Sequence, residues 1–190
     1  MDPETLAKLV FCFENDPERS DGIVSGAQDA IGICMPGLVR HWYDNRFWPE
    51  KIESCHDETV LSWLEDHLCM IPMFPRRPGC SVVEGKDINE QKVRDLADAA
   101  DACWQAITSC DLPAFAAAYR ASFEAQVAMF PAMIQPGVEE YIDRYSAMDG
   151  VLAWKMPGAG GGGYLALVCS DRAHFPDGAV ELHIRRRGTL

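Results

Sequence analysis

Five glycines occur within six consecutive positions near the C-terminal end of this 190-residue chain. Glycine loses more conformational freedom on folding than any other residue, so a run of this kind needs a structural reason. One reason is a loop whose backbone must approach another group closely, and a row of bare N–H groups also forms a concavity for anions. Apolar stretches, residues 151–154 and 164–168, flank the run. The six positions are Gly158, Ala159, Gly160, Gly161, Gly162 and Gly163.

Three interpretations of this run compete. A flexible hairpin or linker is the simplest, although strand-like flanks are not typical of a domain boundary. A dinucleotide-binding fingerprint fits Gly158, Gly160 and Gly163 by spacing, but that motif needs a following helix and an acidic residue about 20 positions later. A Walker loop needs a closing Gly-Lys-Ser/Thr, which does not follow the run. The third interpretation is a glycine loop that closes the floor of a nucleotide and substrate site.

Residues 155–168 resemble the third motif of the GHMP kinases, in which Lys-x-Ser/Thr-Gly-Ala-Gly-Gly-Gly-Gly precedes an apolar strand. Residues 25–32, followed by Met35, Pro36 and Gly37, resemble the Gly-x-Gln-Asp segment of the sugar-kinase branch, which includes fucokinases and heptose-phosphate kinases. Two motifs in the family's order are more specific than either alone, and the resemblance covers roughly residues 6–186. It implies an enzyme that uses ATP and Mg²⁺ to phosphorylate a hydroxyl of a sugar or sugar phosphate.

The chain also departs from the family pattern. Pro157 stands where the family usually has Ser or Thr, and the phosphate-cradling Gly-Leu-Gly-Ser-Ser motif, expected before Leu6, is absent. A second hypothesis therefore stays open, in which the chain is a split, truncated or degenerate kinase half that acts as a non-catalytic binding or assembly module. That hypothesis predicts a homodimer or a separately encoded N-terminal half. A third possibility is a non-kinase protein that uses the fold only as a scaffold.

The resemblance assigns the chemistry to the Gln-Asp segment. Phosphoryl transfer to a hydroxyl needs positioning, charge neutralisation and often a carboxylate that accepts the hydroxyl proton. Asp29 is the implied base, and a structural role for Asp29 as a helix cap is the alternative. Gln28 and Gly26 are the implied substrate-binding residues. The glycine run would support the phosphates or the substrate through its backbone N–H groups.

Magnesium accompanies bound phosphates and needs only one or two protein carboxylates. Members of the family have a Glu at the end of the helix before the Gly-x-Gln-Asp segment. Glu14 fits that place best, with Glu18 as the alternative, and either could equally be a solvated surface charge. Lys155 could contribute positive charge beside the glycine run, or it could be an ordinary lysine at a strand end.

The net charge of the chain argues against some classes of binding partner. The formal net charge is −12, and a surface this acidic repels nucleic acid and anionic membranes. We therefore expect a small-molecule partner, a sugar or sugar phosphate, and neither nucleic acid nor membrane. The basic cluster Arg185, Arg186 and Arg187 is expected to be a solvated tail.

Eight cysteines occur without a C-x-x-C pair, so zinc-ribbon and thioredoxin sites lack their spacing. Several lie in apolar or helical contexts, where cysteine behaves as a small hydrophobe, and we expect the thiols to be reduced. The sequence has neither a signal peptide nor an apolar run of 18 residues, so a cytoplasmic location is expected.

Hydrophobic spacing predicts a mixed order of helices and strands. Helices are expected over residues 3–14, 29–34, 57–68, 89–109, 115–130 and 138–145. Strands are expected over residues 38–43 and 47–52, joined by an Asn-containing turn, and over residues 68–74, 151–155, 164–169 and 179–185. This order predicts an α+β fold with helices on one face of an antiparallel sheet. The resemblance implies a ferredoxin-like GHMP C-terminal domain over residues 56–190, and a remnant of the N-terminal domain with the Gln-Asp segment over residues 1–55.

Overall fold

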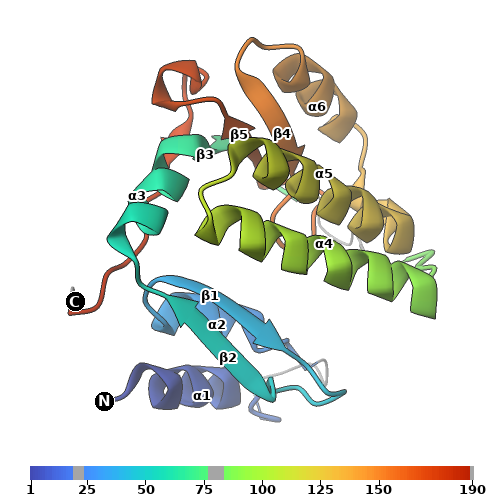
Figure 1. The fold of residues 1–190 in the computed structure, drawn as a ribbon. Coiled ribbons are helices and arrows are strands. Elements are labelled where there is room, and N and C mark those ends of the chain that lie inside the picture. The colour runs from blue at the N-terminus through green and yellow to red at the C-terminus, as the bar shows by residue number, and fades with distance from the viewer. Residues whose placement is uncertain (19–23, 77–83, 189–190) are drawn as a thin grey trace. The chain divides into compact units, whose positions relative to one another are not determined.

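The computed structural model describes residues 1–18, 24–76 and 84–188. The chain divides into two compact units, shown in Figure 1. The first, called the N-terminal unit, comprises Met1–Leu61 and Ile184–Leu190, and the second, the sheet unit, comprises Ser62–His183. The division into GHMP kinase domains at residue 55 stays a prediction. In the described part of the chain, no helix is long and apolar enough to cross a membrane.

Two helices pack together at the start of the N-terminal unit. Helix α1 spans Pro3–Glu14, and helix α2 spans Gln28–Cys34. Asp2 caps α1, because its Oδ2 accepts a hydrogen bond of 3.0 Å from the Thr5 N–H. The buried residues of this small core are Ala7, Ala27, Ile31 and Cys34.

An antiparallel hairpin completes the unit. Strand β1 (Leu38–Trp42) pairs with strand β2 (Lys51–Cys55), with Leu38 opposite Cys55. The hairpin was predicted correctly, but the prediction that its second strand begins at residue 47 is wrong. Residues 43–50 form a longer turn, in which Asn45 adopts a left-handed φ of 69° and Pro49 has no N–H to offer a strand ladder.

Arg185 and Arg186 bind to this unit and are not part of a solvated tail, which corrects the sequence-based expectation for these two residues, whereas Arg187 is exposed. The Gly37 N–H donates to the Arg185 carbonyl at 2.8 Å, and the Arg185 guanidinium donates to the Cys34 carbonyl. Arg186 grips both carboxylate oxygens of Glu58 at 3.0 and 2.7 Å. Backbone and side chain thus tie the segment to the end of α2 and the start of α3.

A four-stranded sheet with antiparallel pairings, in the order β4-β5-β3-β6, forms the sheet unit. Its strands are β3 (Leu68–Pro72), β4 (Val151–Lys155), β5 (Tyr164–Cys169) and β6 (Val180–Glu181). Strand β5 is central, and Leu165 and Leu167 are fully buried. The prediction of a strand over residues 179–185 is wrong in length, because the ladder with β3 ends at Glu181 and residues from Ile184 onward join the other unit.

Helices cover one face of this sheet, so the predicted α+β architecture is confirmed. Figure 1 shows α4 and α5 side by side in front of the strands, and α6 beside β4. Asn89 and Asp111 cap α4 and α5 through side-chain oxygens that accept backbone N–H groups, each at 3.0 Å. The bounds are α3 (Glu58–His67), α4 (Glu90–Thr108), α5 (Leu112–Met129), α6 (Val138–Ser146), and the 3-10 turns η1 (Pro131–Met133) and η2 (Arg172–His174).

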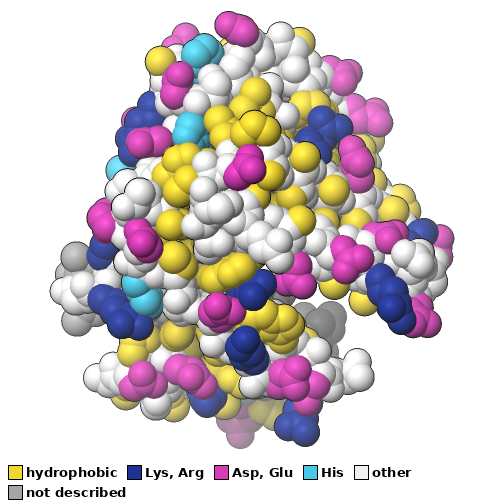
Figure 2. Space-filling view, viewed as in Figure 1, with side chains coloured by type: hydrophobic (Ala, Val, Ile, Leu, Met, Phe, Trp, Pro, Cys, Tyr) yellow, Lys and Arg dark blue, Asp and Glu magenta, His cyan; other side chains and the backbone are white. Residues whose placement is uncertain are grey.

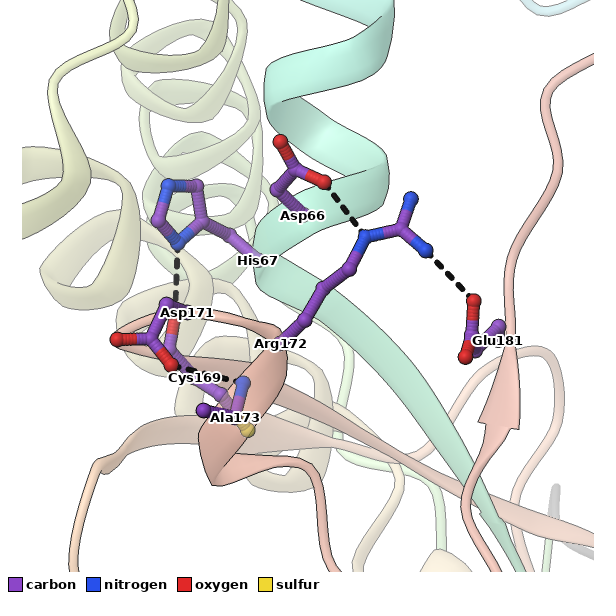
Figure 3. A network of polar contacts seen from close by, with 7 residues as sticks. All are labelled: Asp66, His67, Cys169, Asp171, Arg172, Ala173 and Glu181. Carbon is purple, nitrogen blue, oxygen red and sulfur yellow. Dashed lines mark hydrogen bonds and ion pairs between the residues drawn. The ribbon is translucent and has the colours of Figure 1, made fainter.

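A network of charges joins the end of α3 to the last strand, as Figure 3 shows. Arg172 donates to Asp66 Oδ1 and to Glu181 Oε2, both at 2.6 Å. His67 Nδ1 lies 3.0 Å from the Cys169 carbonyl oxygen, and Asp171 caps η2 through the Ala173 N–H at 2.8 Å. Each of these donors has an acceptor within the same unit. The contacts therefore hold α3, η2 and β6 together, and we assign them a structural role.

The cysteines form no disulfide within the described residues. Seven of the eight are free thiols there, as expected, and Cys80 lies outside those residues. Cys69 and Cys169 are fully buried on neighbouring strands, and a hydrogen bond between their side chains raises the pKa of Cys69. The pair therefore packs as small hydrophobes in the sheet core.

Candidate functional site

The glycine run forms the connection between β4 and β5, and we call residues 156–163 the glycine loop. Gly158 has a φ of +65°, Gly160 and Gly161 of +75°, Gly162 of +139° and Gly163 of +90°. Residues with a Cβ rarely adopt such angles, because the Cβ approaches the following carbonyl oxygen. The run is therefore required by the shape of the loop. A strand, not a helix, follows it, which excludes the dinucleotide fingerprint.

The buried half of the loop also lacks space for side chains. A Cβ at Gly160 would lie 2.9 Å from the Met133 Cβ. A Cβ at Gly162 would lie 2.8 Å from the Phe74 carbonyl oxygen, a backbone atom that cannot move aside cheaply. The bare backbone thus allows the loop to press against η1 and the segment after β3.

Hydrogen bonds fix the same half of the loop. The Gly161 N–H donates to the Met133 carbonyl and the Gly163 N–H to the Phe74 carbonyl, each at 2.9 Å. The Gly163 carbonyl accepts from the Met73 N–H at 2.8 Å, and the Gly160 carbonyl accepts from Arg76 Nε at 3.0 Å. A loop held in this way lies inside one compact unit and is neither a domain linker nor a flexible hairpin.

The other half of the loop is an exposed rim at Pro157, Gly158 and Ala159. The N–H groups of Gly158 and Ala159 donate to no acceptor in the described ranges, so they are available to a ligand. Gln126 of α5 holds the rim in place, because its Nε2 donates a hydrogen bond to the Gly158 carbonyl at 3.2 Å. A rigid turn with exposed donors matches the physical requirement of an anion site.

Gln126 is a residue that sequence reasoning missed. A carbonyl can only accept, so the contact with Gly158 requires the amide nitrogen of Gln126 to face the loop. Its Oε1 is then a buried acceptor without a partner among the described residues. A polar residue on the otherwise apolar stripe of the second long helix was the available signal.

Lys155 points toward helix α5. Its Nζ donates to Ser122 Oγ at 2.9 Å, and burial lowers the pKa of its ammonium, partly offset by Cys103. Of the two sequence interpretations, this geometry favours a lysine at a strand end that ties β4 to α5. We therefore assign no phosphate contact to it.

Asp29 lies in the first turn of α2 and is exposed. It is not the helix cap, because Ala27 occupies that position and makes no side-chain capping bond. The Asp29 carboxylate has no partner among the described residues. Gln28 folds back against Gly26, where a Cβ would collide with the Gln28 amide, so the structure brings these two predicted substrate residues together.

Asn15 ties the end of α1 to the start of the Gln-Asp segment. Its Oδ1 accepts from the Ser25 N–H at 2.6 Å, and its Nδ2 donates to the Phe11 carbonyl at 2.8 Å. Sequence reasoning did not single out Asn15, although Asn is a frequent C-terminal helix residue. The same tie places the end of α1, with Glu14, beside the segment that leads to Asp29.

Glu14 and Glu18 are both exposed carboxylates. In the described ranges no group of three or more His, Cys, Asp or Glu side chains could hold a metal ion. One or two carboxylates suffice for magnesium that arrives with phosphates, so Glu14 stays a predicted ligand. The predicted site thus lies in two places: Gly26, Gln28, Asp29 and Glu14 in the N-terminal unit, and the glycine loop in the sheet unit.

Comparisons with known proteins give structural neighbours only. No protein-family model matches the sequence, and no curated protein does. A structure of "the mevalonate diphosphate decarboxylase from Enterococcus faecalis", described by its "Mevalonate diphosphate mediated ATP binding mechanism", is 15% identical, with a TM-score of 0.56 over 98% of this chain and 59% of that one. A structure described as "MDDEF in complex with MVAPP, AMPPCP and Magnesium" is 14% identical, with a TM-score of 0.56 over 98% and 60%.

The neighbours share the fold of this chain, but the chain covers only part of their length. This chain spans about 60% of the length of those two proteins. At 14% and 15% identity this likeness shows the fold alone, so membership of the GHMP kinase superfamily stays a prediction from the sequence. The sugar-kinase branch also stays a prediction, because the neighbour whose description gives an activity is a mevalonate diphosphate decarboxylase.

Proposed function

We propose that this chain carries the phosphate-binding loop of an ATP-dependent enzyme of the GHMP type, which phosphorylates a hydroxyl of a sugar or sugar phosphate. The observation that supports this most is the glycine loop, whose exposed Gly158 and Ala159 donors stand on a buried base fixed by hydrogen bonds. Neighbours of the same fold include a structure with AMPPCP and magnesium, which agrees with ATP and Mg²⁺ as the cofactors.

The roles of the residues follow from their positions. The rim N–H groups would hold phosphate oxygens, and bound ATP with Mg²⁺ would supply the phosphoryl group and neutralise its charge. Asp29, exposed and unpartnered among the described residues, would accept the proton of the attacking hydroxyl at a carboxylate oxygen. Gln28 and Gly26 would orient the acceptor, and Glu14 would share in holding the metal.

A pair of charge variants at the rim tests the nucleotide site. Ala159 is exposed, so Ala159→Asp and Ala159→Lys leave the buried half of the loop unchanged. By Coulomb's law, Asp at about 6 Å from the phosphates should weaken Mg·ATP binding about tenfold, and Lys should not weaken it. Calorimetric titration of the full chain checks this. Equal affinity of the two variants would contradict a phosphate site at the rim.

A second experiment tests the reaction. The full chain and Asp29→Asn are incubated with Mg·ATP and a panel of hexoses, heptose phosphates and mevalonate diphosphate, and products are followed by ³¹P NMR. A new sugar phosphoester that Asp29→Asn fails to form, with Mg·ATP binding unchanged, supports the kinase. Turnover of mevalonate diphosphate with release of carbon dioxide would overturn the sugar assignment and favour a decarboxylase instead.

A second candidate function is a kinase half that binds or assembles without turnover. Pro157 favours it, because this residue stands where the family usually has Ser or Thr. It predicts Mg·ATP binding that is absent or weak in the chain alone and strengthened by another chain or by self-association. Analytical ultracentrifugation with and without Mg·ATP distinguishes it from the kinase, which predicts turnover by the chain itself.

A further inference from the structure

Arg76 brings a positive charge onto the glycine loop. It lies in the segment after β3, and its Nε donates a hydrogen bond to the Gly160 carbonyl at 3.0 Å. Its backbone is close to the loop as well, because a Cβ at Gly162 would lie 3.0 Å from the Arg76 nitrogen. The side chain is exposed and makes no ion pair with the described residues. None of the roles proposed above uses this charge.

The bond to Gly160 leaves most of the guanidinium free. A guanidinium carries five N–H donors in one plane, and the Nε–H accounts for one of them. The edge formed by Nη1 and Nη2 of Arg76 has no partner in the described part of the chain. Such an edge matches two oxygens of a phosphate, which is why arginine is common where phosphates are recognised. The carbonyl thus holds the side chain without occupying its anion-binding edge.

The rim of the loop turns one of its own donors away from α5. A trans peptide is planar, so its C=O and N–H point in opposite directions. The Gly158 carbonyl accepts from Gln126 of α5, and the peptide that follows it is trans. The N–H of this peptide belongs to Ala159. It therefore points to the side of the loop that faces away from α5.

Arg76 lies on the same side of the loop. The Gly160 carbonyl, which accepts from Arg76, shares its peptide with the Gly161 N–H, and this N–H donates to the Met133 carbonyl of η1. By the same planarity, Arg76 is on the side away from η1. Because η1 begins two residues after α5 ends and packs against it, these two elements mark one side of the loop. The rim N–H and the guanidinium both lie opposite that side.

The rim donor and the guanidinium are also close along the chain. Gly160 follows Ala159 directly, so backbone dimensions place the guanidinium within about 10 Å of the Ala159 N–H. This is comparable to the distance over which charges act at physiological salt, about 8 Å. A chain of phosphates bound at the rim therefore lies within reach of the Nη edge.

The rest of the protein offers little attraction to an anion. The formal net charge is −12, and Figure 2 shows basic side chains interspersed with acidic ones on the face that carries α4 and α5. Lys155 is tied to Ser122, so it does not supply charge to the rim. A cation bonded directly to the loop is the group that offsets the charge of a bound phosphate chain.

We propose that Arg76 is a second phosphate-binding residue of the glycine loop, whose Nη1 and Nη2 edge holds the phosphate chain that the Ala159 N–H also contacts. The inference rests on the proposed function, since it concerns the phosphate site of the same loop. The probes are Mg·AMPPCP and inorganic tripolyphosphate, which share a chain of three phosphorus groups and differ in the nucleoside.

Variants of Arg76 test the charge and the planar edge separately. Arg76→Met should weaken the binding of both probes to the full chain about 10-fold to 100-fold, because charge-assisted hydrogen bonds to phosphate are lost. Arg76→Lys should fall between Arg76→Met and the unchanged chain, since it keeps the charge but not the edge. The matched control is Arg94→Met, which removes the same charge from an exposed arginine of α4 that pairs with Glu90. Calorimetry measures all four affinities.

NMR adds a test that needs no substitution. In the unchanged chain, the Arg76 Nε–H signal should shift with saturation as either probe binds, and that of Arg94 should stay in place. The Gly161 and Gly163 amide signals of Arg76→Met report whether the buried half of the loop is intact.

The outcomes separate this inference from the proposed function. Equal binding by Arg76→Met and the unchanged chain, an unshifted Arg76 Nε–H signal, or an equal loss in Arg94→Met would overturn the role of Arg76 while leaving the phosphate site in place. No binding of either probe by the unchanged chain at millimolar concentration would overturn the phosphate site, and the role of Arg76 with it.

Discussion

The two segments that the family resemblance singles out are built in opposite ways. The glycine loop is half buried, with hydrogen bonds to η1, to the segment after β3 and to α5. The Gln-Asp segment begins a helix of seven residues, and its Gln28 and Asp29 are exposed. A rigid loop presents donors in a fixed geometry before any ligand binds, whereas an exposed carboxylate depends on the substrate or another element for its final position.

Among the variants considered, adding a side chain to the buried half of the glycine loop should cause the largest loss of stability. Gly162→Ala combines a φ of +139° with a Cβ 2.8 Å from a backbone oxygen, so it should cost roughly 3 kcal/mol of unfolding free energy. Gly158 has a φ of +65°, in the left-handed region that other residues adopt at a smaller cost, and has open space around it, so Gly158→Ala should cost about 1 kcal/mol. Urea denaturation measures both. Similar losses for the two variants would show that the buried half of the loop is not tightly packed.

Hydrogen exchange sharpens the same contrast without any substitution. The Gly161 and Gly163 N–H groups are bonded to carbonyls, and those of Gln28 and Asp29 belong to the first turn of a helix, where no intrahelical acceptor exists. We expect the two loop amides to exchange at least about 100-fold more slowly, because protection follows local opening. Comparable rates at the four amides, measured by NMR, would remove the distinction between the segments.

The sequence predicted the helices and strands better than the residues that hold the glycine loop in place. Periodicity gave α1, β4 and β5 with their observed bounds, because Asp2 caps the helix and glycines separate the two short apolar strands. The glycine run was found because its composition is extreme. Gln126, Met133 and Arg76 were not, since they lie far from the loop in the sequence and only the tertiary fold brings them to it. The return of Arg185 to the N-terminal unit was hidden for the same reason.

Asn15 offers a way to loosen the Gln-Asp segment alone. Asn15→Ala removes the acceptor of the Ser25 N–H and the donor to the Phe11 carbonyl, which should cost about 1 kcal/mol because the groups are partly exposed. Amide shifts should change at Ser25 and Asp29 and stay fixed in the glycine loop. Asn15→Asp, which keeps the acceptor, should retain the Ser25 bond; an identical loss for both variants would show that this bond contributes nothing.

The smallest effect concerns pH. A hydrogen bond to Asp171 raises the pKa of His174 above 6.5, with a further contribution from the Asp149 charge. Protonated His174 therefore stabilises the sheet unit below pH 6.5, and that contribution is lost as the pH rises through the folded pKa. His174→Gln should flatten this part of the stability profile and leave the N-terminal unit unaffected. Titration of the His174 ring by NMR checks the direction, and a pKa below 6.5 would contradict it.

The central claim is that the exposed rim of the glycine loop binds phosphates in this chain. The most direct measurement is a ¹H–¹⁵N NMR titration of the full chain with Mg·AMPPCP. We predict that the Gly158 and Ala159 amide signals move downfield with saturation, as free donors acquire phosphate acceptors, while those of Val180 and Glu181 in β6 stay in place. Binding that leaves both rim amides unshifted, or no binding at millimolar nucleotide, would contradict the claim.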